Sequence, residues 1–117
     1  MPETMKTLVK YHIQDYLDDL EDCYDKEDYF SFNFVLDSLC NYLIENIARY
    51  HQLTLAKPKH CHRLLEGVDK KFITKYLELK RVKDPHKKLL DEKKIAGHTL
   101  DVLGGELPAQ WELQSPV

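Results

Sequence analysis

The chain has 117 residues, of which 43% are hydrophobic and 32% are charged, and its formal net charge is −3 at pH 7. That length supplies one core, and the composition is typical of a globular domain rather than of a disordered or fibrous chain. No apolar run approaches the roughly 20 residues that a membrane-spanning helix needs. The N-terminal residues lack the basic and apolar regions of a signal peptide, so we expect a soluble, cytoplasmic protein.

Charge is divided unevenly along the chain. Residues 1–50 carry eleven acids and four bases, whereas residues 51–103 carry thirteen bases and seven acids. Such a division indicates either an interaction face or two halves of one bundle that attract each other.

Two long helices are predicted in the first half of the chain. Apolar residues recur every three or four positions over residues 3–24, which places them on one face of a helix whose other face is acidic. A polar break precedes a second helix over residues 29–53, which is apolar on more than one face and therefore central. Its second apolar stripe consists of Phe30, Phe34, Cys40 and Ile44. Because a small bundle leaves part of such a surface uncovered, we expect a two-fold homodimer.

Turn signals divide the second half into shorter helices. The dipeptide Lys-Pro at 57–58 ends the stretch that contains the second helix, and Gly67 is expected to stop a short helix over residues 59–66. Asp69 is a capping residue for a helix over residues 70–80.

The last helix has a well-marked start. At Asp84 and Pro85, a capping acid is followed by proline at the first helical position, and the helix is expected to reach about residue 103. Its apolar face is interrupted by Glu92 and Lys93. No segment has the pattern of a strand. The sequence therefore predicts an all-α, up-and-down bundle of four to five helices over residues 1–104, followed by a tail over 105–117.

The spacing of cysteine and histidine argues against disulfides and metal sites. Cys23, Cys40 and Cys61 cannot all pair within the chain and form no C-x-x-C motif, so we expect free thiols. His60 and His62 flank Cys61 with residue types suited to zinc, but on a helix they would diverge by about 200°. Glycine-rich phosphate loops and a serine nucleophile motif are also missing from the sequence. We therefore expect neither a metal site nor a cofactor.

An arginine and a histidine flank the break between the last two predicted helices. Arg81 falls near the end of one helix and His86 in the first turn of the next, and such a bend can bring both to one pocket. An arginine can hold a phosphate by two parallel hydrogen bonds, and a histidine can shuttle a proton near neutral pH. The pair is a candidate for cleaving a phosphodiester next to a 2′-hydroxyl without metal. The alternative is a chance spacing with no catalytic role.

Basic residues surround this pair. Residues 70–94 carry ten bases and four acids. Patches of this kind hold nucleic-acid phosphates through counterion release. The candidate nucleic-acid-binding residues are Lys80, Lys83, Lys87 and Lys88. The alternative is an ordinary solvated helical face.

Two stretches resemble the HEPN family, the helical nucleotide-binding domains shared by higher eukaryotes and prokaryotes. They are residues 26–34 (KEDYFSFNF), continued by the long apolar helix, and residues 57–66 (KPKHCHRLLE). The final helix is similar to the family's last helix, and the likeness spans about residues 5–104. The residues that carry the likeness in that final helix are Ile95, Ala96 and Leu100.

The resemblance implies an all-α bundle, commonly a homodimer. Many members are metal-independent RNases that use an arginine and a histidine separated by four to six residues, and Arg81 and His86 match those positions. Other members lack the motif and act as nucleotide-binding or partner modules beside small nucleotidyltransferases. We therefore expect a domain that binds RNA or a nucleotide, with RNase activity as one possibility. The alternative is a non-catalytic interaction module, either a partner of a small nucleotidyltransferase or a regulatory helical adaptor.

Overall fold

The computed structural model describes residues 1–107, which form an all-α bundle as predicted. The helices are α1 (Glu3–Asp25), α2 (Tyr29–Tyr50), α3 (Cys61–Val68), α4 (Lys70–Arg81) and α5 (Pro85–Val102), with a 3₁₀ turn, η1 (Pro58–His60), before α3. Most of the predicted tail, residues 108–117, lies outside the described residues. No helix within residues 1–107 combines the length and the apolarity that crossing a membrane requires.

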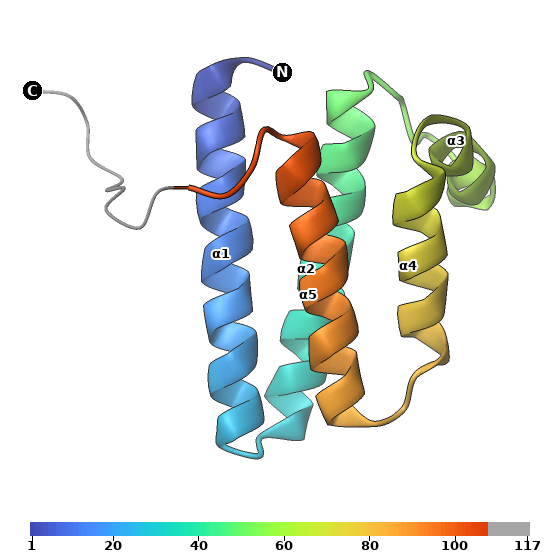
Figure 1. Cartoon of the computed structure of the whole chain (residues 1–117). Helices are drawn as coiled ribbons and strands as arrows, with labels where there is room; N and C mark the ends of the chain where they lie inside the picture. Colours follow the sequence, from blue (N-terminus) through green and yellow to red (C-terminus); the bar gives the residue numbers. More distant parts are fainter. Residues whose placement is uncertain (108–117) are drawn as a thin grey trace, which may run out of the picture.

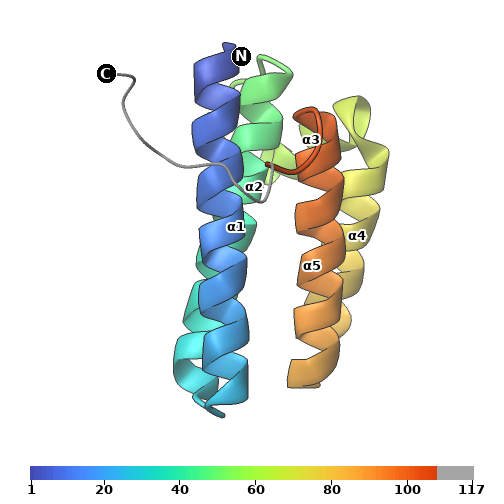
Figure 2. The same cartoon turned by 60° about the vertical axis from the view of Figure 1, so that its left-hand side comes forward.

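The helices pack as two antiparallel pairs (Figure 1). One pair is α1 with α2, the other is α4 with α5, and α5 packs against α1 and α2 as well as α4. The short α3 contacts α4. It lies at the end of the bundle where α2 finishes, away from the turn between α1 and α2. Figure 2 confirms that the turn between α1 and α2 and the segment between α4 and α5 lie at the same end of the bundle.

Apolar side chains from all five helices fill one core and a smaller cluster near the α1–α2 turn. The main core contains Val9, Ile13, Leu39, Cys40, Leu43, Ile47, Ala48, Leu65, Phe72, Ile73, Leu79, Ile95, Ala96, Leu100 and Leu103. The smaller cluster contains Leu20, Phe32, Leu36 and Leu89. Burial of these side chains supplies the main driving force for holding the helices together.

Three of the helices begin at an aspartate. Asp28, Asp69 and Asp84 each accept a hydrogen bond from the backbone N–H three residues further on, at 3.1, 3.0 and 2.9 Å. These bonds satisfy amide groups that have no partner within the helix. The predicted caps at Asp69 and Asp84 are therefore confirmed.

Some predicted helix boundaries are wrong. α2 ends at Tyr50, three residues early, because Gln52 adopts a left-handed backbone with φ of 57° and turns the chain out of the helix. Gly67 does not stop the short helix, which continues to Val68. The first turn of the expected helix is a 3₁₀ turn that begins at Pro58.

The second apolar stripe of α2 is buried in part. Cys40 is buried and Ile44 is half-buried, but Phe30 and Phe34 are 84% and 68% exposed. The bundle therefore leaves part of this apolar surface uncovered at the first turns of α2, as expected from the sequence. The reason is that α1 and α5 pack on its inner side, and its outer face has no neighbouring helix among the described residues.

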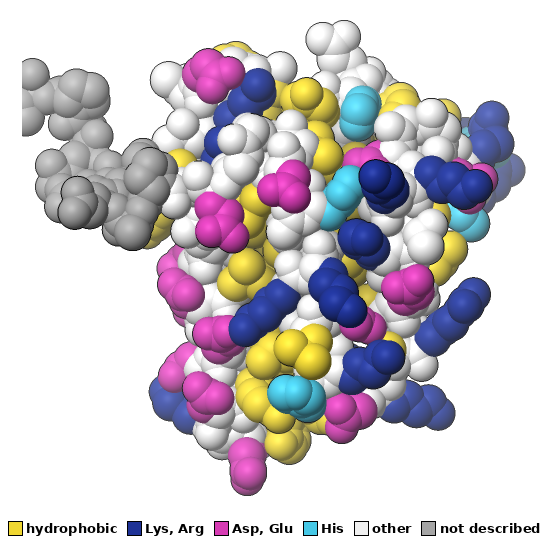
Figure 3. Space-filling model, viewed as in Figure 1, with side chains coloured by type: hydrophobic (Ala, Val, Ile, Leu, Met, Phe, Trp, Pro, Cys, Tyr) yellow, Lys and Arg dark blue, Asp and Glu magenta, His cyan; other side chains and the backbone are white. Residues whose placement is uncertain are grey.

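The two oppositely charged halves of the chain lie side by side. Figure 3 shows acidic side chains gathered over α1 and basic side chains gathered over α4 and α5. An ion pair between Glu21 and Lys93 joins α1 to α5, and Asp37 and Lys80 pair α2 with α4 at 3.6 Å. Attraction between the two halves, one of the two explanations for the charge division, is therefore present.

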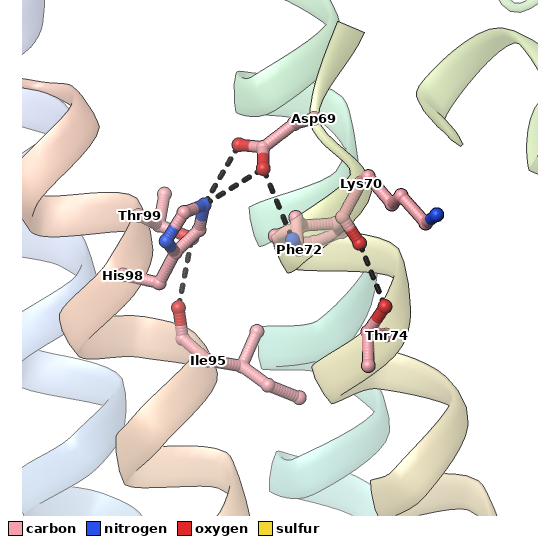
Figure 4. Close-up of polar contacts among 7 residues, drawn as sticks. All are labelled: Asp69, Lys70, Phe72, Thr74, Ile95, His98 and Thr99. Carbon is pink, nitrogen blue, oxygen red and sulfur yellow. Dashed lines mark hydrogen bonds and ion pairs between the residues drawn. The ribbon is translucent and has the colours of Figure 1, made fainter. Parts of the chain in front are cut away.

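A part-buried hydrogen-bonded pair, His98 and Asp69, connects the start of α4 to α5 (Figure 4). Nε2 of His98 lies 2.9 and 2.8 Å from the two carboxylate oxygens of Asp69, which also caps α4. The side chains of His98 and Asp69 are 17% and 9% exposed. Asp69 thus fixes both the first turn of α4 and its distance from α5.

Replacing His98 should destabilise the bundle. In His98→Ala the carboxylate of Asp69 loses a partner where little water reaches it, so the free energy of unfolding should fall by about 1–3 kcal/mol. Urea unfolding followed by circular dichroism measures the change. The control is His62→Ala, which removes an exposed pair with Glu66 at 3.3 Å and should cost less than about 0.5 kcal/mol. Equal losses in the two variants would contradict a structural role for the pair of Asp69 and His98.

Candidate nucleic-acid interface

The candidate interface is the segment that joins α4 to α5. Arg81 is the last residue of α4, and Val82 leaves the helix in an extended conformation with ψ of 138°. Asp84 is also extended, as expected for a residue before proline, and Pro85 begins α5. The sequence therefore forces a sharp break here, and Arg81 and His86 lie on its two sides.

A tyrosine from α1 contacts the histidine of this junction. The hydroxyl of Tyr24 lies 3.2 Å from Nδ1 of His86, and their ring centroids are 5.8 Å apart. Tyr24 also packs against the buried ring of Phe32, with centroids 6.0 Å apart. The imidazole is thus oriented by a half-buried side chain, while its Nε2 has no hydrogen-bond partner within residues 1–107.

Three cations at the junction are unpaired. Arg81, Lys83 and Lys87 are exposed, and no ion pair or side-chain hydrogen bond holds any of them in the part of the chain that the structure describes. They lie within seven positions of one another, at one end of the bundle. Their charge is available to an external anion.

The other two predicted binding lysines are held by α2. Nζ of Lys80 lies 3.6 Å from Asp37 and 5.3 Å from the centroid of the Tyr76 ring. Nζ of Lys88 donates a hydrogen bond to Asn33 at 3.1 Å. A phosphate would have to compete with these contacts, so Lys80 and Lys88 are weaker candidates than Lys83 and Lys87.

A polar cavity of about 240 Å³ lies between α2 and the junction. Its lining consists of Asn33, Leu36, Asp37, Leu79, Lys80, Val82 and Lys88. The two lysines and two of their partners therefore form one hollow beside Arg81. It is large enough for a small group such as a phosphate together with water.

A carboxyl and a thiol are buried one helical turn from this cavity. Glu92 follows Lys88 by one turn of α5, and Cys40 follows Leu36 by one turn of α2. The Cys40 thiol donates to Oε2 of Glu92 at 3.0 Å, and Oε1 has no hydrogen-bond partner among residues 1–107. Glu92 is fully buried, although its position in the apolar stripe was interpreted as an interruption.

Burial changes the protonation of this pair. Desolvation raises the pKa of Glu92 to about 7, against the opposing effects of the Cys40 hydrogen bond and the charge of Lys80. Desolvation, reinforced by the nearby carboxyl, also raises the pKa of the Cys40 thiol far above its usual range. Glu92 is therefore a neutral acid at mildly acidic pH, and Cys40 is a protonated, unreactive thiol.

The structure brings some of the predicted site residues together and adds one. Arg81, His86, Lys83 and Lys87 share the junction, but no contact joins Arg81 to His86 within the described chain. Sequence reasoning missed Tyr24, because its place in the apolar stripe of α1 indicated a core residue. Finding it would have required knowing that the end of α1 meets the start of α5.

The His-Cys-His stretch forms no metal site in the described residues. His60 ends the 3₁₀ turn and Cys61 begins α3, while His62 pairs with Glu66. No group of three or more potential ligands gathers anywhere within residues 1–107. Cys23, Cys40 and Cys61 are all free thiols.

Comparisons with known proteins add no assignment. No family model, curated protein or solved structure matches the chain. The likeness to the HEPN family therefore depends on the residues quoted above, and the functional argument depends on the geometry of the junction.

Glu92 should make stability depend on pH. A carboxyl whose pKa rises on folding contributes fully below its unfolded pKa, near 4.5, and that contribution is lost as the pH rises towards 7. From about pH 5 to pH 7.5, this group should lower the free energy of unfolding by about 2 kcal/mol. Urea unfolding across this range should show the loss in the native chain and in Glu45→Gln, an exposed control. In Glu92→Gln that part of the pH dependence should vanish, and its persistence would exclude Glu92 as the cause.

Proposed function

We propose that the α4–α5 junction binds RNA through its phosphates. The observation that supports this is the group of three exposed, unpaired cations, Arg81, Lys83 and Lys87, beside an exposed histidine. Cations that are tied to protein carboxylates gain little from a phosphate, whereas free ones release counterions from the nucleic acid when they bind. The resemblance to the HEPN family supports the same reading.

A second candidate function is cleavage of that RNA without metal, and it is favoured by the contact between Tyr24 and His86. The hydroxyl of Tyr24 orients the imidazole and leaves Nε2 free to take the proton of a 2′-hydroxyl. The 2′-oxygen then bonds to phosphorus and the bond to the 5′-oxygen breaks. The leaving oxygen receives the proton from His86, and a 2′,3′-cyclic phosphate results. Arg81 would stabilise the charge that develops on the phosphate oxygens.

The alternative is a non-catalytic module that binds a protein, such as a small nucleotidyltransferase. In that case the free cations would meet acidic side chains rather than phosphates. A module that binds nucleic acid should bind an added oligonucleotide, whereas a module that binds only protein should not. The experiments below therefore separate the two functions.

Binding should depend steeply on salt and on the junction lysines. Each lost phosphate contact reduces the slope of log affinity against log salt by about 0.7 on a single strand. Replacing both Lys83 and Lys87 by glutamine should therefore flatten the slope by about 1.4. Fluorescence anisotropy with a labelled single-stranded RNA measures it. The matched control replaces Lys70 and Lys71, exposed lysines at the other end of α4, and should leave the slope unchanged. A chain that binds no RNA at low salt overturns the proposal.

Cleavage, if present, should depend on the histidine and the arginine. His86→Ala and Arg81→Ala should each slow cleavage by roughly two to four orders of magnitude, the usual worth of a positioned catalytic group. Tyr24→Phe keeps the ring and loses the hydroxyl, so it should produce a smaller loss. Gel analysis should show cleavage that survives chelators and spares DNA of the same sequence. RNA that is bound but remains intact, or is cut equally fast by His86→Ala, would limit the function to binding.

A further inference from the structure

The outer face of α2 exposes two phenylalanines. Phe30 and Phe34 lie one helical turn apart and are 84% and 68% exposed, the largest exposures among the large apolar side chains of residues 1–107. Further along the same face the residues are polar, as at Asn41 and Glu45. The aromatic pair therefore forms a local apolar patch, which we call the Phe30/Phe34 face. Patches of adjacent exposed aromatics are typical of protein interfaces.

Basic side chains border this face on one side. Asn33 and Asp37 lie within about 60° of Phe30 around the helix axis. Lys88 of α5 contacts Asn33 at 3.1 Å, and Lys80 of α4 lies 3.6 Å from Asp37. Asp37 balances one of these charges, so the flank keeps a net positive charge.

Acidic side chains border the face on the other side. Tyr42 lies about 120° from Phe30 around the axis of α2, on the side away from Asn33 and Asp37. It packs against Tyr16 of α1, with ring centroids 5.6 Å apart, so α1 forms this flank. Asp19 of α1 and Asp28 at the start of α2 both lie close enough to Cys23 to act on its thiol electrostatically. No ion pair holds Asp19 or Asp28 within the described chain, and the flank keeps a net negative charge.

We propose that the Phe30/Phe34 face binds the same face of a second copy of this chain, with the two-fold axis running along α2. A rotation of 180° about an axis parallel to α2 makes the faces of the two copies meet. It also places each flank of one copy opposite the other flank of its partner. The acidic flank of one copy then lies opposite the basic flank of the other, twice, while the aromatic pairs meet at the centre. A two-fold axis perpendicular to α2 within the interface would instead place the acidic flanks of the two copies opposite each other. The charge pattern therefore selects the partner and also the arrangement, with the two α2 helices parallel.

This assembly goes beyond the proposed RNA binding, and the centre of its interface uses different residues. Phe30 and Phe34 form that centre, whereas RNA binding was assigned to Arg81, Lys83 and Lys87, so the two phenylalanines and these three cations separate the two activities. Loss of one activity can therefore be observed without loss of the other.

Sedimentation velocity on the whole chain, freed of nucleic acid, tests the proposal. The native chain should be a dimer at about 200 µM and should dissociate on dilution. Replacing both phenylalanines by serine should give a monomer with an unchanged circular dichroism spectrum. Leu8→Ser, which changes a 42% exposed apolar residue of α1, is the matched control and should remain a dimer.

Charge reversal tests the arrangement. Lys88→Glu and Asp19→Lys should each weaken dimerisation at least tenfold, because each places like charges opposite one another at two places. An equimolar mixture of the two variants restores opposite charges at both places, so it should form a dimer of one copy of each. A mixture that stays monomeric overturns the parallel arrangement.

Other outcomes would overturn the proposed partner. A native chain that is monomeric at about 200 µM, or that dimerises only when RNA is added, would show that a second copy is not what binds this face. Dimerisation that persists when both phenylalanines are serine would place the interface elsewhere.

Discussion

The burial of α5 against three other helices is the constraint on which the rest of the structure depends. Because α1, α2 and α4 all pack on it, most of its circumference is removed from water. Its apolar residues, among them Ile95, Ala96 and Leu100, supply the packing surface. The same arrangement buries polar groups. A buried polar group needs a hydrogen-bond partner. Thr99 has one, because its hydroxyl donates a hydrogen bond to the carbonyl of Ile95 at 3.0 Å.

Glu92 is the residue for which this burial has the largest chemical effect. Loss of water on burial raises the pKa of its carboxyl, against the hydrogen bond that one carboxyl oxygen accepts from the Cys40 thiol. The other carboxyl oxygen has no partner among the described residues. The charge of Lys80, which lines the cavity beside the junction, opposes that shift in pKa. An anion in the cavity would offset the charge of Lys80 and strengthen the neutral form further. An anion bound there would therefore raise the pKa of Glu92.

The positions of the helices and part of the candidate site could be predicted from the sequence. Regular apolar spacing, the caps at Asp69 and Asp84 and the turn signal at Pro58 indicated all five α-helices, because these signals act within a few residues. The junction of Arg81 and His86 could be predicted for the same reason. The contacts of Tyr24 with His86 and of Asp69 with His98 could not, because each joins helices whose neighbours are decided by packing of the whole bundle. The exposure of Phe30 has the same explanation, since an apolar residue looks alike in sequence on a covered and an uncovered face.

The pairing of helices also has a consequence for the order of folding. α1 with α2, α3 with α4 and α4 with α5 are neighbours in sequence, so these contacts close short loops and can form early. The contacts of α5 with α1 and α2 join distant parts of the chain and require the two helical hairpins to meet. Because Glu92 on α5 meets Cys40 on α2, its carboxyl loses water in this late step. Docking of the hairpins, rather than formation of either one, is therefore the step of folding that we expect to be sensitive to protons.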